Sequence, residues 1–427
     1  LEKPIIVIKP GRSAEAAQAA ASHTGSLAGS DEVFEAAMER AGVLRVNSIS
    51  ELFHMASVLG RQPRPKGPKL AIVTNAGGPS VLATDATVIN GAQVAKIEAS
   101  SIEKLDQFLP SAWSHANPVD ILGDASAETY AKTIDVLAHD SENDGILVIL
   151  SPQDMTDPVK TAESMRSYAH LKDRPILASW MGGSFVRKGI EILNSSHIPT
   201  FEYPDDAAWS FATMWKHSQN LAGLYEMHTS PEKDHIEFTE TERAEEAAKI
   251  IHQVRQEKRT LLTEFESKKL LLLYGIPTVE TFIAKTPEEA VKFAIQLQYP
   301  VVLKLLSEKI THKSDIGGVH LNLTDEQSVR RAYQRIYDAV VSKYDTDHFQ
   351  GVTVQKMIKQ EGYELILGSS VDPQFGPILL FGAGGILVEI FKDRALALPP
   401  LNLNLAKRLM QKTKIYHALL GVRGRPP

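Results

Sequence analysis

Short apolar runs alternate with amphipathic segments through roughly the first 200 residues of the chain. The runs have the length and continuity of buried strands. One intervening segment repeats apolar residues at helical spacing between Ser30, at the position of an N-cap, and Gly42, at the position of a left-handed C-terminal residue. This alternation predicts a parallel sheet covered by helices. The runs lie at residues 5–8, 70–73, 146–150 and 176–178.

The pattern divides the chain into several parts. At 427 residues it is long enough for two to four domains, at roughly 100–200 residues each. We expect α/β domains at residues 1–116 and 117–226, a charged helical linker at 227–260, and an α+β domain at 261–427. In the last of these, helices are predicted at 264–274 and 327–343, and strands at 300–305, 352–355, 363–369 and 378–381.

Composition excludes several classes of function. A net charge of −6 without a basic block argues against nucleic acid as the main partner. The absence of cysteine excludes disulfides, thiol catalysis and cysteine-ligated metals. No apolar run approaches the ~20 residues that cross a bilayer, and no signal-peptide pattern is present, so we expect no membrane and a cytoplasmic location. The chain opens without a methionine and closes just after a helical stretch, so we expect a piece of a longer protein.

The run Ser22-His23-Thr24-Gly25-Ser26 places an imidazole beside hydroxyls and glycine, just before a predicted helix start. This setting suits a phosphorylated histidine, because backbone N–H groups and the positive helix end can hold phosphoryl oxygens. Thr24, Gly25 and Ser26 are then candidate phosphate contacts. The alternative is that His23 only caps the Ala-rich helix expected at residues 14–21.

A second glycine-bearing turn, residues 74–80, follows the strand predicted at 70–73. A strand, then glycines, then a helix with proline in its first turn is an anion-binding arrangement, so Gly77 and Gly78 are candidate phosphate contacts. A tight turn in any doubly wound fold also uses glycines. The nearby turn opened by Asn117 carries Asp120, which is more often a cap than a ligand.

A third group follows the strand predicted at residues 300–305. Lys304 lies inside its apolar run, where an ammonium group needs an anionic partner such as a nucleotide phosphate. The polar residues 311–315, which include His312, precede two glycines, and this composition is typical of a mobile loop. A solvated surface loop is the alternative.

A fourth group begins with the strand that runs into Gln355, Lys356 and Met357. A strand end of this kind can present backbone donors and acceptors to an adenine edge. Glu364 adjoins the apolar run 365–367, where a carboxylate needs a polar partner or a metal. We therefore predict that Lys304 and Glu364 belong to one nucleotide site.

These motifs together resemble the ADP-forming (nucleoside-diphosphate-forming) acyl-CoA synthetases, relatives of succinyl-CoA synthetase. The resemblance covers essentially the whole chain, and the order of the motifs is the one expected in that family. The matching segments are residues 22–31, similar to the phosphohistidine segment; 74–79 and 117–121, similar to succinyl-CoA-ligase-type domains; and 263–268, 274–277 and 312–319, similar to parts of an ATP-grasp domain.

The resemblance implies two flavodoxin-like domains followed by an ATP-grasp domain. It also implies that phosphate attacks an acyl-CoA to give an acyl phosphate, whose phosphoryl group passes to His23 and then to ADP. His312 would be a second phosphoryl carrier. Lys304 and Glu364 would contact the nucleotide, and residues 355–357 would read adenine. The implied small molecules are ATP or ADP, Mg²⁺, coenzyme A, phosphate and a short-chain carboxylic acid, and the implied assembly is a homo-oligomer.

The same resemblance places two parts of the family outside this sequence. A CoA-binding domain, with the carboxylate that orients the phosphohistidine, is expected before Leu1. The segment that supplies magnesium ligands is expected after Pro427, so no metal ligand is assigned here. We expect the polypeptide as it stands to be catalytically incomplete.

Two alternatives stay open. Residues 393–402 look more like the subgroup of the family that is fused to an acetyltransferase domain and modifies protein lysines. Members of that subgroup that only acetylate often lack the phosphohistidine, whereas His23 is present here. A non-catalytic acyl-CoA sensor is the other alternative, and it would need neither His23 nor His312.

Overall fold

The computed structural model describes residues 3–13, 15, 16, 18, 30–225, 239–310, 312–358, 362–385 and 392–422. The chain forms two compact units. The first combines Leu1–Thr229 with Glu364–Pro427, and the second is Ser230–Tyr363.

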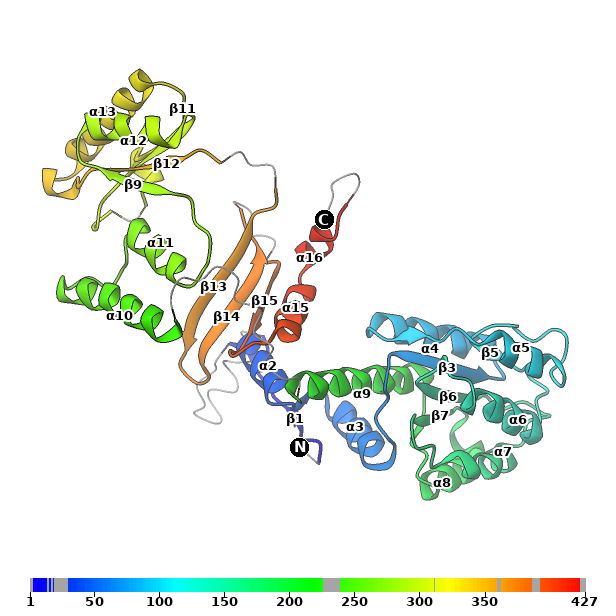
Figure 1. Cartoon of the computed structure of the whole chain (residues 1–427). Coiled ribbons are helices and arrows are strands. Elements are labelled where there is room, and N and C mark those ends of the chain that lie inside the picture. The colour runs from blue at the N-terminus through cyan, green and yellow to red at the C-terminus, as the bar shows by residue number, and fades with distance from the viewer. Residues whose placement is uncertain are drawn as a thin grey trace. The chain divides into compact units, whose positions relative to one another are not determined.

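A six-stranded sheet organises most of the first unit, and all of its strand pairs are parallel (Figure 1). Its strands are β3 (Lys69–Thr74), β4 (Gln93–Val94), β5 (Val119–Asp120), β6 (Gly145–Leu150), β7 (Ile176–Trp180) and β8 (Thr200–Phe201). The spatial order is β4-β3-β6-β7-β8, and the short β5 pairs with the end of β3. Without β5 this is the 2-1-3-4-5 order of flavodoxin-like sheets, which confirms the predicted fold class.

Both faces of this sheet are buried. Ala71 and Val73 of β3 pack in a core formed with α5 (Ala99–Asp106), α6 (Ala127–Ala138), α7 (Pro158–Ser164) and α8 (Arg187–Ser195). Leu70 and Ile72 point to the opposite face, into a core formed with α3 (Ile49–Arg61), α4 (Gly77–Ile89) and α9 (Pro204–Tyr225). Burial on both sides explains why these strands are continuous apolar runs in the sequence.

The domain boundary expected between residues 116 and 117 falls inside this sheet. β3 lies before that position and β6 after it, and the two strands pair from Leu70–Gly145 to Thr74–Ile149. The turn opened by Asn117 interrupts the pattern because it contributes only the two-residue strand β5. Residues on both sides of the predicted boundary therefore belong to a single sheet.

The remainder of the first unit comes from both ends of the chain. Parallel strands β1 (Ile6–Ile8) and β2 (Leu44–Val46) accompany α2 (Asp31–Arg40). An antiparallel sheet contains β13 (Leu365–Asp372), β14 (Gly376–Ala383) and β15 (Arg394–Ala397), and α15 (Leu403–Gln411) and α16 (Lys414–Leu419) follow it. The contacts that link these parts include an ion pair between Arg394 and Glu32 at 3.0 Å and a hydrogen bond from Arg408 to the carbonyl of Gln219 at 2.7 Å.

The second unit is an antiparallel sheet with helices packed on one face. The strand order is β11-β10-β12-β9, with β9 (Thr281–Ala284), β10 (Val301–Leu305), β11 (Val319–Leu323) and β12 (Val352–Lys356). Helices α12 (Pro287–Leu297) and α13 (Glu326–Lys343) bury the side chains of Val301, Leu303, Leu305, Val352 and Val354. Helices α10 (Glu240–Gln256) and α11 (Glu264–Leu273) precede the sheet.

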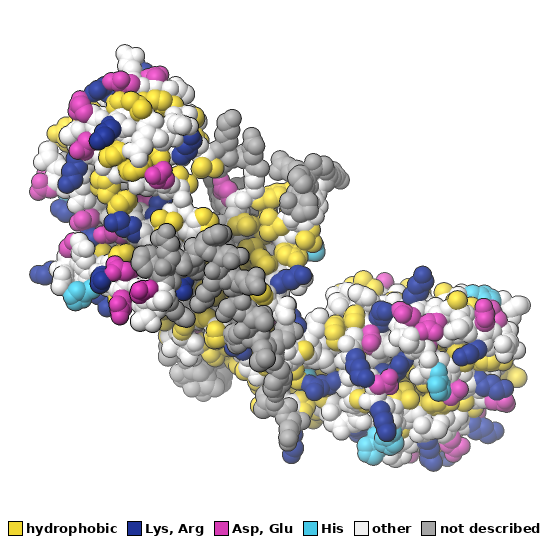
Figure 2. Space-filling view, in the orientation of Figure 1, with side chains coloured by type: hydrophobic (Ala, Val, Ile, Leu, Met, Phe, Trp, Pro, Cys, Tyr) yellow, Lys and Arg dark blue, Asp and Glu magenta, His cyan; other side chains and the backbone are white. Residues whose placement is uncertain are grey.

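Most strands and helices predicted from the sequence are present within two or three residues of the expected bounds. The Ala-rich helix expected at 14–21 lies largely outside the described residues. None of the helices in the described part of the chain has the length and apolar character needed to cross a membrane. On the face shown in Figure 2, basic and acidic side chains are interspersed, in keeping with the modest net charge of −6.

Asn117 serves the sheet rather than a ligand. Its Oδ1 accepts a hydrogen bond from the amide of Ile72 at 2.9 Å, and its Nδ2 donates to the carbonyls of Leu70 and Ala95 at 2.8 and 2.9 Å. One side chain thus satisfies backbone groups along the edge of β3 between its short partners β4 and β5.

We predict that Asn117→Ala lowers the free energy of unfolding of the first unit by about 2–4 kcal/mol, because three partly buried backbone groups lose their partner. Urea titration followed by circular dichroism would measure the change. Asn90→Ala is the matched control: its exposed side chain caps the carbonyl of Ala86 at 2.7 Å, and the substitution should cost less than about 1 kcal/mol. Equal effects of the two substitutions would contradict the bridging role of Asn117.

Candidate functional site

The carboxyl edge of the parallel sheet carries a tightly tied pair of loops. Asn75, directly after β3, donates from Nδ2 to the carbonyl of Ser151 at 2.8 Å and accepts from the Ser151 amide at 2.9 Å. Ser151 directly follows β6, so the two bonds join adjacent loops at the point where the strand order reverses. Ligands of open α/β sheets bind at this switch point.

Helix α4 begins at the same edge with an open N-terminus. Gly77 and Gly78 form its exposed start, and among the described residues no side chain caps it. A Cβ on Gly78 would have no neighbour within 4 Å. At Gly78 the first turn and positive end of this 13-residue helix therefore face open space, as an anion-binding site requires, whereas a Cβ on Gly77 would lie 3.4 Å from Oδ2 of Asp120.

A cavity of about 690 Å³ lies along this edge. Its lining comes from the loops that follow β5, β6 and β7, and comprises Gly123, Asp124, Pro152, Gln153, Asp154, Met155, Thr156, Pro158, Gly182 and Phe185. Gly182 has φ +133°, and a Cβ there would lie 2.5 Å from Cγ of Pro152. Only glycine therefore fits at this position of the cavity lining without a steric clash.

The predicted phosphohistidine run, with His23, Thr24, Gly25 and Ser26, lies outside the described residues. The described chain resumes at Ser30, and α2 begins at Asp31. The Asp31 carboxylate pairs with Arg45 at 2.5 Å and with Arg12 at 3.3 Å. These ion pairs connect residues on both sides of the run.

In the second unit, strand alternation separates the polar residues from the core. Leu303 and Val354 point into the core with α12 and α13, so Lys304 and Gln355 point to the opposite face. Lys356, one residue further along β12, points back and donates to the carbonyl of Leu297 at 3.0 Å, at the end of α12. The amide of Met357 donates to the carbonyl of Pro300 at 3.0 Å.

Glu264, the first residue of α11, lies against this second face of the sheet. Its Oε1 accepts from Lys304 Nζ at 2.9 Å and from Gln355 Nε2 at 2.7 Å, and pairs with Lys268 Nζ at 3.2 Å. Its Oε2 pairs with Lys313 Nζ at 3.4 Å. We call Glu264, Lys268, Lys304, Lys313 and Gln355 the lysine cluster.

The lysine cluster holds Glu264 in its charged form. Burial alone would raise the pKa of this carboxyl, but hydrogen bonds from Lys304 and Gln355 and the charges of Lys304 and Lys268 outweigh it and lower the pKa to about 2. Sequence reasoning found Lys304 and Gln355 but missed Glu264, Lys268 and Lys313. The only available signal was the spacing of Glu264 and Lys268 on one helical face, which surface ion pairs share.

Two further predicted site residues, His312 and Glu364, are not members of the lysine cluster. His312 is exposed and directly precedes Lys313, whereas Thr311 lies outside the described residues. A 3₁₀ turn, Ser314–Ile316, follows, and the amide of Gly318 donates to the carbonyl of Lys313 at 2.8 Å.

Glu364 precedes β13 in the first unit, where its carbonyl accepts from the amide of Gly384 at 2.7 Å. The proposed pairing of Lys304 and Glu364 in one site stays a prediction.

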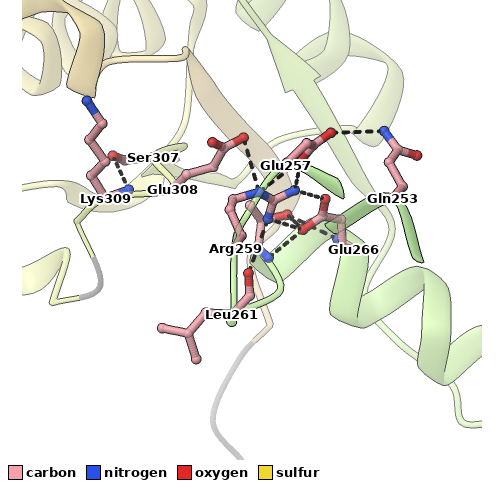
Figure 3. A network of polar contacts seen from close by, with 9 residues as sticks. Gln253, Glu257, Arg259, Leu261, Glu266, Ser307, Glu308 and Lys309 are labelled. Carbon is pink, nitrogen blue, oxygen red and sulfur yellow. Dashed lines mark hydrogen bonds and ion pairs between the residues drawn. The ribbon is translucent and has the colours of Figure 1, made fainter. Parts of the chain in front are cut away.

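A second ion-pair centre fixes the start of α11 (Figure 3). The guanidinium of Arg259 binds Glu266 at 2.7 Å and Glu257 at 2.5 Å, and lies 3.7 Å from Glu308. Glu266 also completes a capping box with Thr263. Hydrogen bonds from Arg259, together with those from Thr263, outweigh burial and lower the pKa of Glu266 to about 2. The helix that carries Glu264 is therefore anchored at its first turn.

The donor set of the lysine cluster suits phosphate oxygens, since ammonium and amide groups converge on one point. Within the described residues, no three histidine, aspartate or glutamate side chains converge in a way that could hold a metal ion. The cluster therefore fits a nucleotide's phosphates, and no magnesium ligand is placed by these residues.

The sequence matches three family models. They describe a succinyl-CoA ligase like flavodoxin domain at residues 1–59, a ligase-CoA domain at residues 70–218 and an ATP-grasp domain at residues 253–427. 4-Hydroxybutyrate–CoA ligase [ADP-forming] of Nitrosopumilus maritimus is 36% identical over 428 residues, which cover 100% of this chain and 60% of that protein.

Two other relatives are also ADP-forming ligases, or a subunit of one, by name. Acetate–CoA ligase [ADP-forming] I of Archaeoglobus fulgidus is 37% identical over 425 residues, covering 100% of this chain and 59% of that protein. The beta subunit of acetate–CoA ligase [ADP-forming] I of Pyrococcus furiosus is 42% identical over 187 residues, covering 44% of this chain and 79% of that subunit. The chain belongs to the ADP-forming acyl-CoA synthetase family. It spans about 60% of the length of the first two relatives.

The low pKa of Glu264 predicts a pH dependence of the stability of the second unit. A carboxylate whose pKa is lowered by folding from 4.5 to about 2 stabilises the folded state above about pH 4.5, and this stabilisation is lost as the pH falls toward 2. We expect Glu264→Gln to remove on the order of 1–2 kcal/mol of that dependence in the second unit, after allowance for solvent screening.

Urea titrations at about pH 5 and about pH 3 would measure the difference. Glu326→Gln is the control, since its side chain is 57% exposed and pairs with Arg330 at the surface. An unchanged pH dependence in Glu264→Gln would show that the lysine cluster contributes no linked stability.

Proposed function

We propose that this chain is the greater part of an acid–CoA ligase that interconverts acyl-CoA, ADP and phosphate with carboxylic acid, ATP and coenzyme A. The observation that carries the proposal is the alignment of the complete chain, at 36–37% identity, with two relatives named as ADP-forming ligases. Both relatives act on small carboxylic acids by name, so the proposed substrate is a small carboxylic acid. Mg²⁺ would accompany the nucleotide and screen its phosphates.

The first unit supports the acyl half of this reaction. Phosphate attacks the thioester carbon of the acyl-CoA, the C–S bond breaks, and the products are an acyl phosphate and coenzyme A. The open N-terminus of α4 at Gly77 and Gly78 suits the phosphate, because its N–H groups supply donors for the oxygens. The cavity of about 690 Å³ at the same edge of the sheet suits the acyl group.

His23 is the proposed carrier between the two halves. A ring nitrogen of His23 takes the phosphoryl group from the acyl phosphate and releases the carboxylic acid. The phosphohistidine then gives the group to the terminal phosphate of ADP, which forms ATP and restores the imidazole. Thr24, Gly25 and Ser26 are proposed to contact the phosphoryl oxygens, and His312 is the proposed second carrier beside the nucleotide.

The second unit supports the nucleotide half. Lys304 and Gln355 present donors on the face of the ATP-grasp sheet opposite α12 and α13, and residues 355–357 form the strand end proposed to read adenine. Lys356 would act there through its backbone, because its side chain caps α12, and Met357 through its carbonyl, because its amide donates to Pro300. Glu364 keeps its proposed contact with the nucleotide. A cytoplasmic location and a homo-oligomer also remain predictions.

The phosphohistidine is directly testable. We expect the intact enzyme, incubated with γ-labelled ATP and Mg²⁺, to carry label that survives alkali and is lost in mild acid. His23→Ala should abolish both the label on that peptide and acyl-CoA synthesis, while urea titration shows unchanged stability. His139→Ala is the control: this exposed histidine lies at the C-terminus of α6, and its replacement should preserve both the label and acyl-CoA synthesis. Turnover by His23→Ala, with label only at His312, would contradict the assignment and leave His23 as a helix cap.

A further inference from the structure

The lysine cluster carries more positive than negative charge. Three lysine ammonium groups surround the single carboxylate of Glu264. All four charged side chains are largely buried, with exposed fractions of 18% for Lys268, 19% for Lys313, 23% for Glu264 and 29% for Lys304. The neighbouring Glu266 does not offset this excess, because its carboxylate is engaged by Arg259 and Thr263.

Excess charge of one sign in a half-buried site raises the free energy of the folded state unless a counter-ion joins it. The pKa of Lys268 reflects this cost: it is lowered first by burial, and the charges of Lys304 and Lys313 lower it further. A ligand with several negative charges would relieve the repulsion. A nucleotide polyphosphate is such a ligand, and it is a substrate in the proposed function.

The geometry at Glu264 resembles that expected of a bound phosphate oxygen. Lys304, Lys268 and Gln355 all converge on the same oxygen, Oε1, at 2.7–3.2 Å. An anionic phosphate oxygen accepts the same kind of charge-assisted hydrogen bonds over the same distances. Lys313 makes the longest contact, 3.4 Å to Oε2, and therefore has the weakest hold on the carboxylate.

We propose that Glu264 is an internal stand-in for a nucleotide phosphate: its carboxylate gathers the three lysines, and an incoming nucleotide competes with it for them. Glu264 thereby lowers the affinity for nucleotide while it keeps the lysines in place. This inference rests on the proposed function, because that function makes the nucleotide the ligand of this face.

The test is the affinity of Glu264→Gln for ADP, measured by calorimetry on the intact protein. Gln keeps the size of the side chain and an acceptor oxygen but removes the competing charge, so we expect ADP to bind about tenfold more tightly. Inorganic tripolyphosphate, which lacks the base and ribose, should show the same gain. Lys304→Met, which removes a donor, should weaken both ligands.

Glu266→Gln is the matched control, because it changes the same charge two residues away on the same helix but acts on Arg259. Its ADP affinity should equal that of the wild type. If Glu264→Gln does not fold, Glu264→Asp replaces it: the shorter carboxylate reaches fewer of the four donors, and ADP should again bind more tightly.

An affinity of Glu264→Gln, or of Glu264→Asp in its place, that is unchanged or weaker than wild type would overturn the competition, and would make Glu264 only a support for the lysines. That result, with normal ADP binding by the wild type, would leave the proposed function standing. A wild-type protein that binds no ADP would overturn the proposed function together with this inference.

Discussion

The alternation of side chains along a β-strand is the constraint on which both units depend. In the parallel sheet, helices cover both faces, so every residue of β6 is buried and every one is apolar or glycine. In the ATP-grasp sheet, α12 and α13 cover one face, and Glu264 of α11 meets the other. The alternate positions of β10 and β12 point to this second face and hold Val302, Lys304, Thr353 and Gln355, whose polar groups find hydrogen-bond partners there.

This constraint also explains what the sequence could predict. The doubly buried strands were recognisable because continuous apolar runs have few other interpretations, and Lys304 stood out as a charge inside such a run. The boundary placed at residue 116 failed because β5 is only two residues long and its turn at Asn117 looks like a domain junction. Only the pairing of β3 with β6, 75 residues apart in the register Leu70–Gly145, reveals one sheet.

The lysine cluster lay beyond sequence reasoning for a different reason. Glu264 and Lys268 follow the spacing of an ordinary surface ion pair, and Lys313 belongs to a polar loop with no periodicity. Their significance comes from the docking of α11 against the second sheet face, which brings residues from four segments to one carboxylate. The phosphohistidine run stood out by its residue types, and the resemblance to the family supported that interpretation over a helix cap. The presence of His23 and His312 favours a synthetase over an acyl-CoA sensor. The alternative of a fused acetyltransferase depends on a domain that would lie outside these residues.

The anchoring of α11 has a consequence for how substitutions combine. Arg259 is shared by three acidic residues from three segments: Glu257 after α10, Glu266 in α11 and Glu308 after β10. A guanidinium that loses one of these partners keeps the other two, whereas removal of Arg259 leaves three carboxylates close together. Substitution of Glu257 or Glu308 should therefore be mild, and should become favourable once Arg259 is gone, whereas Glu266 also completes the capping box with Thr263. We expect the effects of evolutionary substitutions at these four positions to depend strongly on one another, with Arg259 the last of them to be replaced.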